Sequence, residues 1–181
     1  MTVSLTPHPD SRQNAVKAVS ADVRRTATGL ALRYELTGDT SALAIPELSN
    51  PSRADELWKH TCFEVFVRKA DGKGYLEFNL SPTGEWAAYG FDGYRDGMTN
   101  VTAVKSVPIG TRLADQAFAL KAEIDLAGVK GLPEGDWTVA VTSVVEATDG
   151  SKSYWALAHP QGKPDFHAAD GFVLNLPAPA N

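Results

Sequence analysis

The chain has 181 residues, a formal net charge of −5 and a pI near 5.3, and its lysines and arginines are scattered. This length suffices for one domain that folds without disulfides or a metal, and the acidity argues against the basic surface that nucleic-acid binding requires. We find no export signal and no run of about 20 apolar residues that could cross a bilayer, so we expect a cytoplasmic protein with no membrane partner. The sequence leaves the oligomeric state open.

The predicted elements are strands almost throughout. We expect a single domain over residues 1–181, with an irregular arm at 1–14 and a frayed tail at 177–181. Strand-like runs occupy residues 16–24, 30–37, 60–69, 75–80, 85–91, 101–107, 117–126, 137–146, 154–158 and 171–176. Apolar and polar residues alternate within residues 30–36 and 118–125, the period of half-buried strands. Because Gly, Pro and Asp turns separate these runs, the sequence predicts an all-β, two-sheet antiparallel β-sandwich of jelly-roll or immunoglobulin-like type.

Residues 58–95 are the most informative part of the chain, because two short turns join three strand-like segments into a meander. An apolar face forms if Phe63, Val65 and Val67 lie across from Leu80, Phe78 and Leu76.

The opposite face of this meander is then polar. Glu64 lies across from Asn79, Phe66 lies across from Glu77, and a two-residue Pro-Thr turn would place Trp86 beside Asn79. A carboxylate, an amide and an indole on one sheet face suit a polyhydroxylated ligand, although such a face could equally be solvated. Glu64 and Glu77 could also form the acid pair of a glycoside-active enzyme.

A second polar cluster follows near the C-terminus, where Trp155, His159, Asp165 and His167 fall within thirteen residues. A proline-rich loop stabilised by these side chains is one interpretation, and a ligand site is the other. The spacing lacks the three or four convergent ligands of a zinc site, so we expect no metal. The single cysteine, Cys62, lies in an apolar strand and is expected to be a buried thiol.

The loop after the meander carries Tyr94, Arg95 and Met98. The guanidinium of Arg95 can bind a carboxylate or a sugar hydroxyl, and the ring of Tyr94 can stack on a ligand. Met98 is of interest because a methionine and a histidine together can ligate haem iron.

The order of several motifs resembles that of the bacterial DOMON-like proteins, a group similar to the family-nine carbohydrate-binding modules. The motifs are HP at 8–9, LWKHTCFEVF at 57–66, YLEFNLSP at 75–82, WAAYGFDGYRDGM at 86–98, YWALAHP at 154–160 and KPDFH at 163–167. The resemblance implies a β-sandwich that binds a sugar or a haem rather than a catalytic domain. Sugar binding in such modules rests on paired tryptophans, whereas haem would be ligated here by Met98 with His159 or His167.

We therefore expect a small-ligand-binding domain, with a carbohydrate as the preferred ligand and no cofactor. Haem binding and glycoside hydrolysis by Glu64 and Glu77 remain the alternatives. Trp86 and Trp155 are expected to stack on the sugar. The predicted binding residues are Trp58, Glu64, Glu77, Asn79, Trp86, Tyr94, Arg95, Trp155, His159, Asp165 and His167.

Overall fold

The computed structural model describes residues 1–11, 15–130, 132 and 135–179. Within them lie short 3₁₀ helices and twelve β-strands. The strands are β1 (Thr2–Pro7), β2 (Val16–Arg25), β3 (Gly29–Gly38), β4 (Cys62–Lys69), β5 (Tyr75–Leu80), β6 (Trp86–Phe91), β7 (Thr99–Asn100), β8 (Ile109–Ala114), β9 (Ala117–Asp125), β10 (Trp137–Glu146), β11 (Lys152–Ala156) and β12 (Leu174–Leu176). The 3₁₀ helices are η1 (Thr40–Ala42), η2 (Leu57–Lys59) and η3 (Ala169–Gly171). No helix in these ranges is long and apolar enough to span a membrane.

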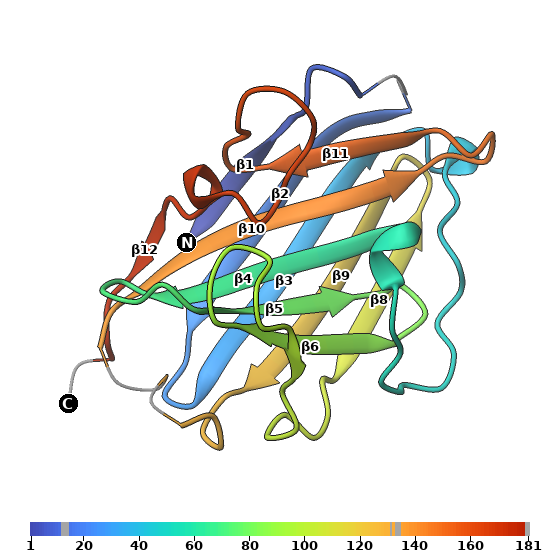
Figure 1. Cartoon of the computed structure of the whole chain (residues 1–181). Helices are drawn as coiled ribbons and strands as arrows, with labels where there is room; N and C mark the ends of the chain where they lie inside the picture. The colour runs from blue at the N-terminus through green and yellow to red at the C-terminus, as the bar shows by residue number, and fades with distance from the viewer. Residues whose placement is uncertain (12–14, 131, 133–134, 180–181) are drawn as a thin grey trace.

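The strands form two antiparallel layers that face each other (Figure 1). One layer has the order β7-β6-β5-β4-β10-β11, with β12 also paired to β10, and the other has the order β2-β3-β9-β8. Strand β1 connects them, because it pairs with β2 along Thr2–Leu5 and with β11 at Thr6 and Pro7. The predicted antiparallel sandwich is confirmed.

The main core lies between the two layers and is built by alternation along each strand. On β3, Leu30, Leu32, Tyr34 and Leu36 point inward and are nearly inaccessible. On β9, the residues that point inward are Phe118, Leu120, Ala122 and Ile124. The facing layer contributes apolar residues of β4, β5 and β10, so both sheets bury one face.

Two expectations along the chain are wrong. The predicted irregular arm contains strand β1, because the edge of β2 that does not pair with β3 and the end of β11 supply partners for its backbone groups. The predicted strand over 101–107 is mostly loop, and the chain becomes extended at β7 and β8 on either side of it. Residues 12–14 of the arm and 180–181 of the tail lie outside the described residues. Within the remainder of the tail, the backbone N–H of Ala178 donates to Oδ1 of Asp136.

The outer face of the first layer is partly covered as well. Strand β4 is buried on both faces over Cys62–Val67, which a half-solvated sheet would not show. A second apolar cluster lies on this outer face, and the partly buried Leu57 and Phe166 pack on it; the cluster is Phe66, Tyr75, Ala87, Tyr89, Phe91, Ala140 and Phe172. The loop after β11 and the η2 segment therefore make a third, partial layer over the sheet.

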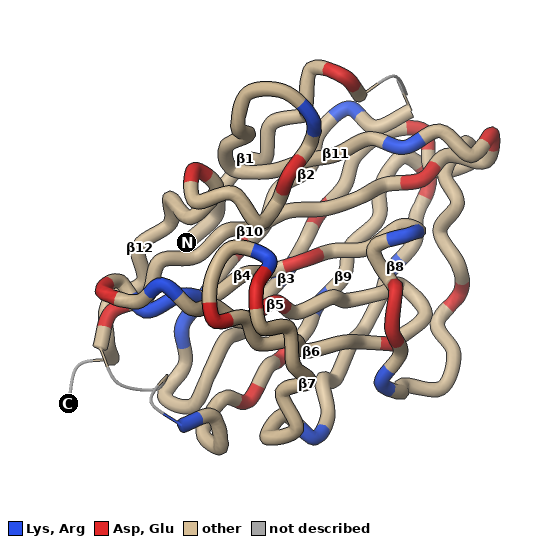
Figure 2. Tube along the Cα trace, viewed as in Figure 1, with Lys and Arg blue, Asp and Glu red and all other residues tan. Residues whose placement is uncertain are grey.

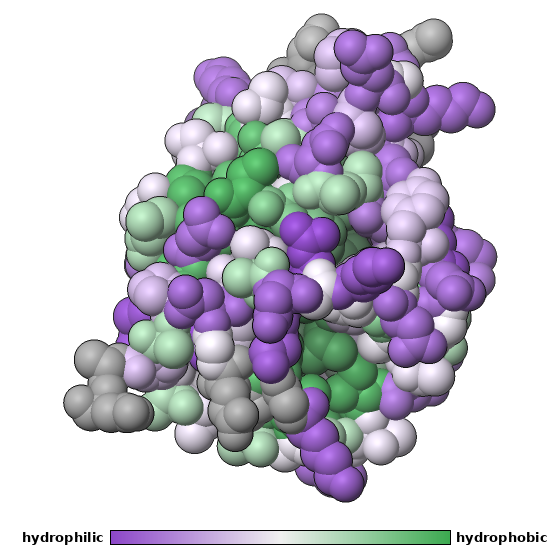
Figure 3. Space-filling model, turned by 60° about the vertical axis from the view of Figure 1, so that its left-hand side comes forward, coloured by the Kyte–Doolittle hydropathy of each residue, from purple (hydrophilic) through white to green (hydrophobic). Residues whose placement is uncertain are grey.

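Charged residues of both signs are interspersed over the two layers and their loops (Figure 2). The side of the molecule turned forward in Figure 3 is mainly hydrophilic, with apolar residues visible between the charged ones. Glu64 on β4 and Glu77 on β5 depart from this surface pattern, because both are buried. The outer face of the first layer is therefore the candidate location of a site.

Candidate binding site

The predicted register of β4 with β5 is confirmed. Glu64 lies opposite Asn79 and Phe66 lies opposite Glu77, while Phe63, Val65 and Val67 face the core with their predicted partners. Antiparallel alternation therefore delivers Glu64 and Glu77 to the outer face of the sheet, as expected.

The register of β5 with β6 differs from the prediction by one residue. Asn79 lies opposite Ala87, and Trp86 lies opposite Leu80. The cause is the turn: the N–H of Gly84 donates to the carbonyl of Ser81 at 3.0 Å, and the N–H of Ser81 donates to the carbonyl of Glu85 at 2.9 Å. Two-residue hairpin turns need a positive φ that Pro82 cannot adopt, so the chain forms a three-residue loop with Gly84 at φ +90°.

The one-residue shift reverses the role of Trp86. Its side chain faces the core, is 4% exposed and contacts the Arg53 guanidinium, 4.7 Å from the ring centroid. Trp155 is also a core residue, with its Nε1–H donating to Oγ of Ser153 at 2.9 Å. The expectation that these two tryptophans stack on a ligand is wrong, since both point away from the outer face.

A cavity of about 540 Å³ lies on that outer face. Its walls come from η2, from β4, β5, β6, β10 and β11 of the first layer, and from the loops after β6 and β11. The lining residues are Trp58, Glu64, Glu77, Tyr89, Phe91, Arg95, Met98, Val144, Tyr154, Pro164, Phe166 and His167. Five predicted site residues are thus brought together: Trp58, Glu64, Glu77, Arg95 and His167.

Glu64 is the most buried of the polar lining residues, at 3% exposure. Its Oε2 accepts from the hydroxyl of Thr142 at 3.3 Å, while its Oε1 has no hydrogen-bond partner among the described residues. Burial, and then repulsion from the Glu77 carboxylate, raise the pKa of Glu64 well above its ordinary value, against the opposing effect of the Thr142 hydrogen bond.

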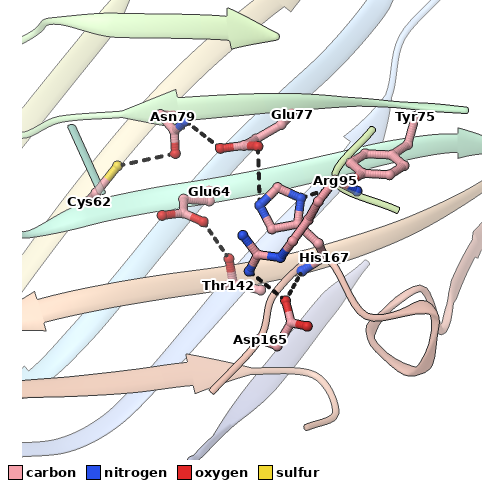
Figure 4. Close-up of polar contacts among 9 residues, drawn as sticks. All are labelled: Cys62, Glu64, Tyr75, Glu77, Asn79, Arg95, Thr142, Asp165 and His167. Atoms are coloured by element: carbon pink, nitrogen blue, oxygen red, sulfur yellow. Dashed lines mark hydrogen bonds and ion pairs between the residues drawn. The ribbon is translucent and has the colours of Figure 1, made fainter. Parts of the chain in front are cut away.

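Unlike Glu64, Glu77 has a polar neighbour at each of its two carboxyl oxygens. The Asn79 amide donates to Oε1 of Glu77 at 2.7 Å, and Nε2 of His167 lies 3.7 Å from Oε2 (Figure 4). Burial raises the pKa of Glu77, and the Asn79 hydrogen bond and the Arg95 charge act in the opposite direction. Asn79 is fully buried and does not line the cavity, so it positions Glu77 rather than offering itself to a ligand.

His167 is held as a neutral ring by contacts with Tyr75 and Glu77, both on β5. The backbone N–H of Arg95 donates to the Tyr75 hydroxyl oxygen, and that hydroxyl lies 2.7 Å from Nδ1 of His167. Burial, and then the nearby Arg95 charge, lower the pKa of His167 to about 4. Because the Tyr75 oxygen already accepts from Arg95, its O–H donates to Nδ1. In that tautomer the ring proton is on Nε2, the nitrogen nearer to Glu77.

Arg95, Tyr94 and Asp165 link the two loops over the cavity. Arg95 lies 2.8 Å from Oδ1 of Asp165, and the Tyr94 hydroxyl donates to Oδ2 at 2.6 Å. The backbone N–H of His167 also donates to Oδ1 of Asp165, at 3.1 Å. Tyr94 and Asp165 do not line the cavity themselves, so we regard them as residues that hold Arg95 and His167 in place.

His159 is not part of this site. Its Nε2 lies 2.8 Å from the carbonyl oxygen of Thr6, and its ring packs edge-on against His8. No group of three or more metal-ligating side chains occurs within the described ranges. Cys62 is a buried free thiol, as expected, and donates to Oδ1 of Asn79.

Sequence reasoning missed the aromatic residues that complete the cavity. Tyr89 and Phe91 follow from the corrected β6 register, and Tyr154 lies opposite Val144 in the β10–β11 pairing. Phe166 comes from an irregular loop, so no strand alternation could have placed it. Of the four tryptophans in the chain, only Trp58 lines the cavity, and it meets Tyr89 edge to face at 6.1 Å.

A larger cavity, of about 730 Å³, lies on the other side of η2, between the segment that follows β3 and the β5–β6 turn. It has no Phe, Tyr or Trp in its lining, and its His60 lies 2.7 Å from Glu146. Aromatic rings and buried polar groups are the features of a small-molecule site, so the smaller cavity is the better candidate.

No protein-family model matches this chain, and no curated protein matches it. Among solved structures, a Bacteroides uniformis protein described as a candidate carbohydrate-binding protein superposes with a TM-score of 0.69 at 16% identity, over 98% of this chain and 85% of that one.

A family 9 carbohydrate-binding module from Caldicellulosiruptor kristjanssonii also superposes. Its cellotriose complex gives a TM-score of 0.52 at 11% identity, over 89% of this chain and 75% of the module. Its glucose complex gives 0.50 at 10% identity, over 84% and 72%. At these identities the likeness establishes a shared β-sandwich fold.

Proposed function

We propose that this chain is a carbohydrate-binding domain that takes a small sugar into the outer cavity and performs no chemistry on it. The observation that carries the proposal is the composition of the cavity, in which aromatic rings adjoin buried carboxylates. A sugar ring presents C–H groups to an aromatic face and hydroxyls to polar groups around its edge. Trp58, Tyr89 and Tyr154 supply rings, while Glu64, Glu77 and Arg95 supply hydrogen-bonding groups.

The fold supports the same proposal. The glucose and cellotriose complexes belong to a module with this sandwich architecture, and the Bacteroides uniformis protein has the greater structural similarity. The motif order that resembles the DOMON-like proteins is a further reason to place the chain near sugar-binding sandwiches. The expected pair of tryptophans is replaced here by Trp58 together with tyrosine and phenylalanine rings.

Hydrolysis by Glu64 and Glu77 is the second candidate function, because both carboxyl groups line one cavity. A glycosidase needs the pKa values of its two carboxyl groups to be pushed apart, so that one is an acid and the other an ionised base or nucleophile. Burial raises the pKa of both groups here, and the proposal of binding rests instead on the composition of the cavity.

Haem ligation would require Met98 with His159 or His167. Met98 and His167 line the same cavity, but Tyr75 and Glu77 flank the two ring nitrogens of His167. Nε2 of His159 contacts the carbonyl oxygen of Thr6, away from the cavity. These contacts favour a sugar over haem, and a visible spectrum after expression with added haem tests the alternative.

The experiment for sugar binding is isothermal titration calorimetry of the purified chain with mono- and oligosaccharides, glucose and cellotriose included. We expect saturable binding that weakens at least tenfold in Trp58→Ala and Tyr154→Ala, the scale of an aromatic contact worth about 1.4 kcal/mol. Leu113→Ala is the control, since Leu113 is an exposed residue of β8 on the other layer. Equal losses in all three variants, or binding unaffected by Trp58→Ala, would place the ligand elsewhere.

A further inference from the structure

One polar atom of Glu64, a residue that lines the outer cavity, has no donor supplied by the described chain. Oε1 of Glu64 is buried and unpartnered, although its sister oxygen accepts from Thr142. Leaving a carboxylate oxygen unpaired in an apolar setting is costly, because the lost hydration is not replaced. The missing donor is therefore expected to arrive with the ligand, and Figure 4 shows Glu64 on the same sheet face as Glu77 and Arg95.

The groups around Glu64 do not stabilise its ionised form, which is why its pKa is raised. On its own strand and the next, its neighbours are the Cys62 thiol and the Glu77 carboxylate. From the other layer, the Tyr34 hydroxyl donates to the Glu64 backbone carbonyl rather than to its side chain. Among the described residues that line the cavity, Arg95 is the only lysine or arginine, and it is already paired with Asp165 at 2.8 Å. The neighbouring His167 is neutral because its pKa is lowered to about 4.

The walls of the cavity also suit a positive charge. Five aromatic side chains line it: Trp58, Tyr89, Phe91, Tyr154 and Phe166. The face of an aromatic ring carries partial negative charge and attracts an ammonium group, with greater effect where water is excluded. Arg25 over Trp137 and Arg53 over Trp86 show the same preference elsewhere in this molecule.

We propose that the ligand is a sugar that carries an ammonium group, that is, an amino sugar whose –NH₃⁺ binds Glu64. This inference rests on the proposed sugar-binding function and narrows it. An ammonium group supplies the donor that Oε1 lacks, stabilises the ionised form of Glu64 and faces the aromatic rings, whereas the sugar ring stacks on the same walls. A neutral sugar could supply a hydroxyl donor to Oε1, but it has no positive charge for the carboxyl group or the aromatic rings.

The test is calorimetry with two matched series, glucosamine against glucose and N-acetylglucosamine, and galactosamine against galactose and N-acetylgalactosamine. It is run at slightly acidic pH, where the free amines are protonated. We expect at least one amino sugar to bind about tenfold more tightly than both of its neutral relatives, as a charge-assisted hydrogen bond to a buried carboxylate predicts. The acetylated sugars keep the nitrogen and lose its charge, so they separate charge from shape.

Glu64→Gln is the decisive variant, because glutamine preserves the shape and removes the charge. It should bring the affinities for the amino sugar and its neutral parent within about twofold of each other, whereas Glu35→Gln, an exposed change on β3, should leave the preference intact. Because a bound ammonium group lowers the raised pKa of Glu64, repeating the titration in buffers of different ionisation enthalpy should show proton release with the wild-type chain and none with Glu64→Gln. Thermal melting of each variant verifies that it is folded.

The outcomes separate the two proposals. If neutral sugars bind as tightly as amino sugars, or if Glu64→Gln retains the preference, the ammonium proposal is wrong and sugar binding stands. If neither the amino sugars nor the neutral sugars bind, the proposed function fails, and the ammonium proposal fails with it.

Discussion

Trp86 provides the sharpest test of the structure, because the register of a single hairpin decides whether it belongs to the core or to the ligand site. In the structure it faces the core opposite Leu80. Replacing it with alanine should therefore lower the free energy of unfolding and leave the outer cavity unchanged.

The size of the effect follows from the burial of Trp86. At 4% exposure, a tryptophan removes about 200 Å² from water, which at about 25 cal/mol per Å² is worth about 5 kcal/mol. Alanine retains part of this area, and the loss of the Arg53 contact adds about 0.5–1 kcal/mol. We expect a net loss of about 3–5 kcal/mol, in line with other buried aromatic-to-alanine changes.

The assay is urea denaturation followed by circular dichroism, with sugar titration of the folded protein in parallel. Trp58→Ala is the matched control, since Trp58 is 39% exposed and lines the cavity. It should cost less than about 1.5 kcal/mol of stability and weaken sugar binding, the reverse of the pattern for Trp86→Ala.

The reasoning is refuted if Trp86→Ala lowers the free energy of unfolding by less than about 1 kcal/mol while sugar affinity falls. That result would mean that β6 pairs with β5 in the register expected from a two-residue turn. Equal loss of stability in the two tryptophan variants would also contradict the assignment of Trp58 to an exposed wall.

Three further predictions test the turn, the buried carboxylate and the loop contacts. Gly84→Ala should lower the free energy of unfolding by about 1 kcal/mol or more, because Gly84 has φ +90° and the new Cβ would lie 3.1 Å from a leucine methyl. Gly150→Ala is the control: Gly150 has φ +82°, but its new Cβ would have no described atom within 4 Å, so the loss in the same urea assay should be smaller. Because the pKa of Glu64 is raised on folding, the folded state holds this proton more tightly, so its contribution to stability is present at low pH and is lost as pH rises through the folded pKa. Glu64→Gln should therefore gain stability relative to wild type as pH rises, and a difference that is constant with pH would contradict this. Asp165→Asn breaks the ion pair with Arg95, whose side chain is 52% exposed, so it should lower the free energy of unfolding by less than about 1 kcal/mol in urea denaturation. The same variant should weaken sugar binding in calorimetry. Unchanged affinity would show that the loops hold Arg95 in place without the ion pair.

The pairing of β4 with β5 shows how far local sequence reasoning reaches. Phe63, Val65 and Val67 alternate with polar and aromatic residues, and only one register gives both strands a continuous apolar face. The same alternation predicted the inward residues of β3 and β9. Side chains alternate between the two faces of a strand with a period of two, which is a property of the strand backbone. The pattern can therefore be recognised in the sequence without any knowledge of the fold.

Trp86 was misplaced although the information was present in the sequence. Pro82 has a fixed negative φ and Gly84 tolerates a positive one, which together favour a three-residue loop over a two-residue turn. One residue in the loop moves every later side chain of β6 to the other face. The error therefore came from turn chemistry, and it placed Trp86 opposite Asn79, where Ala87 lies.

By itself, the sequence determined the sandwich class, most of the strands and the position of Glu64 and Glu77 on one sheet face, because these depend on alternation and on neighbours along the chain. Only the tertiary structure decided that this face is covered by η2 and the loop after β11, that Tyr154 and Phe166 join its walls, and that His159 lies elsewhere. These contacts are made through irregular loops, which have no periodicity from which their direction could be predicted. The raised pKa of Glu64 was decided in the same way, since it depends on how completely those distant segments exclude water from the carboxyl group.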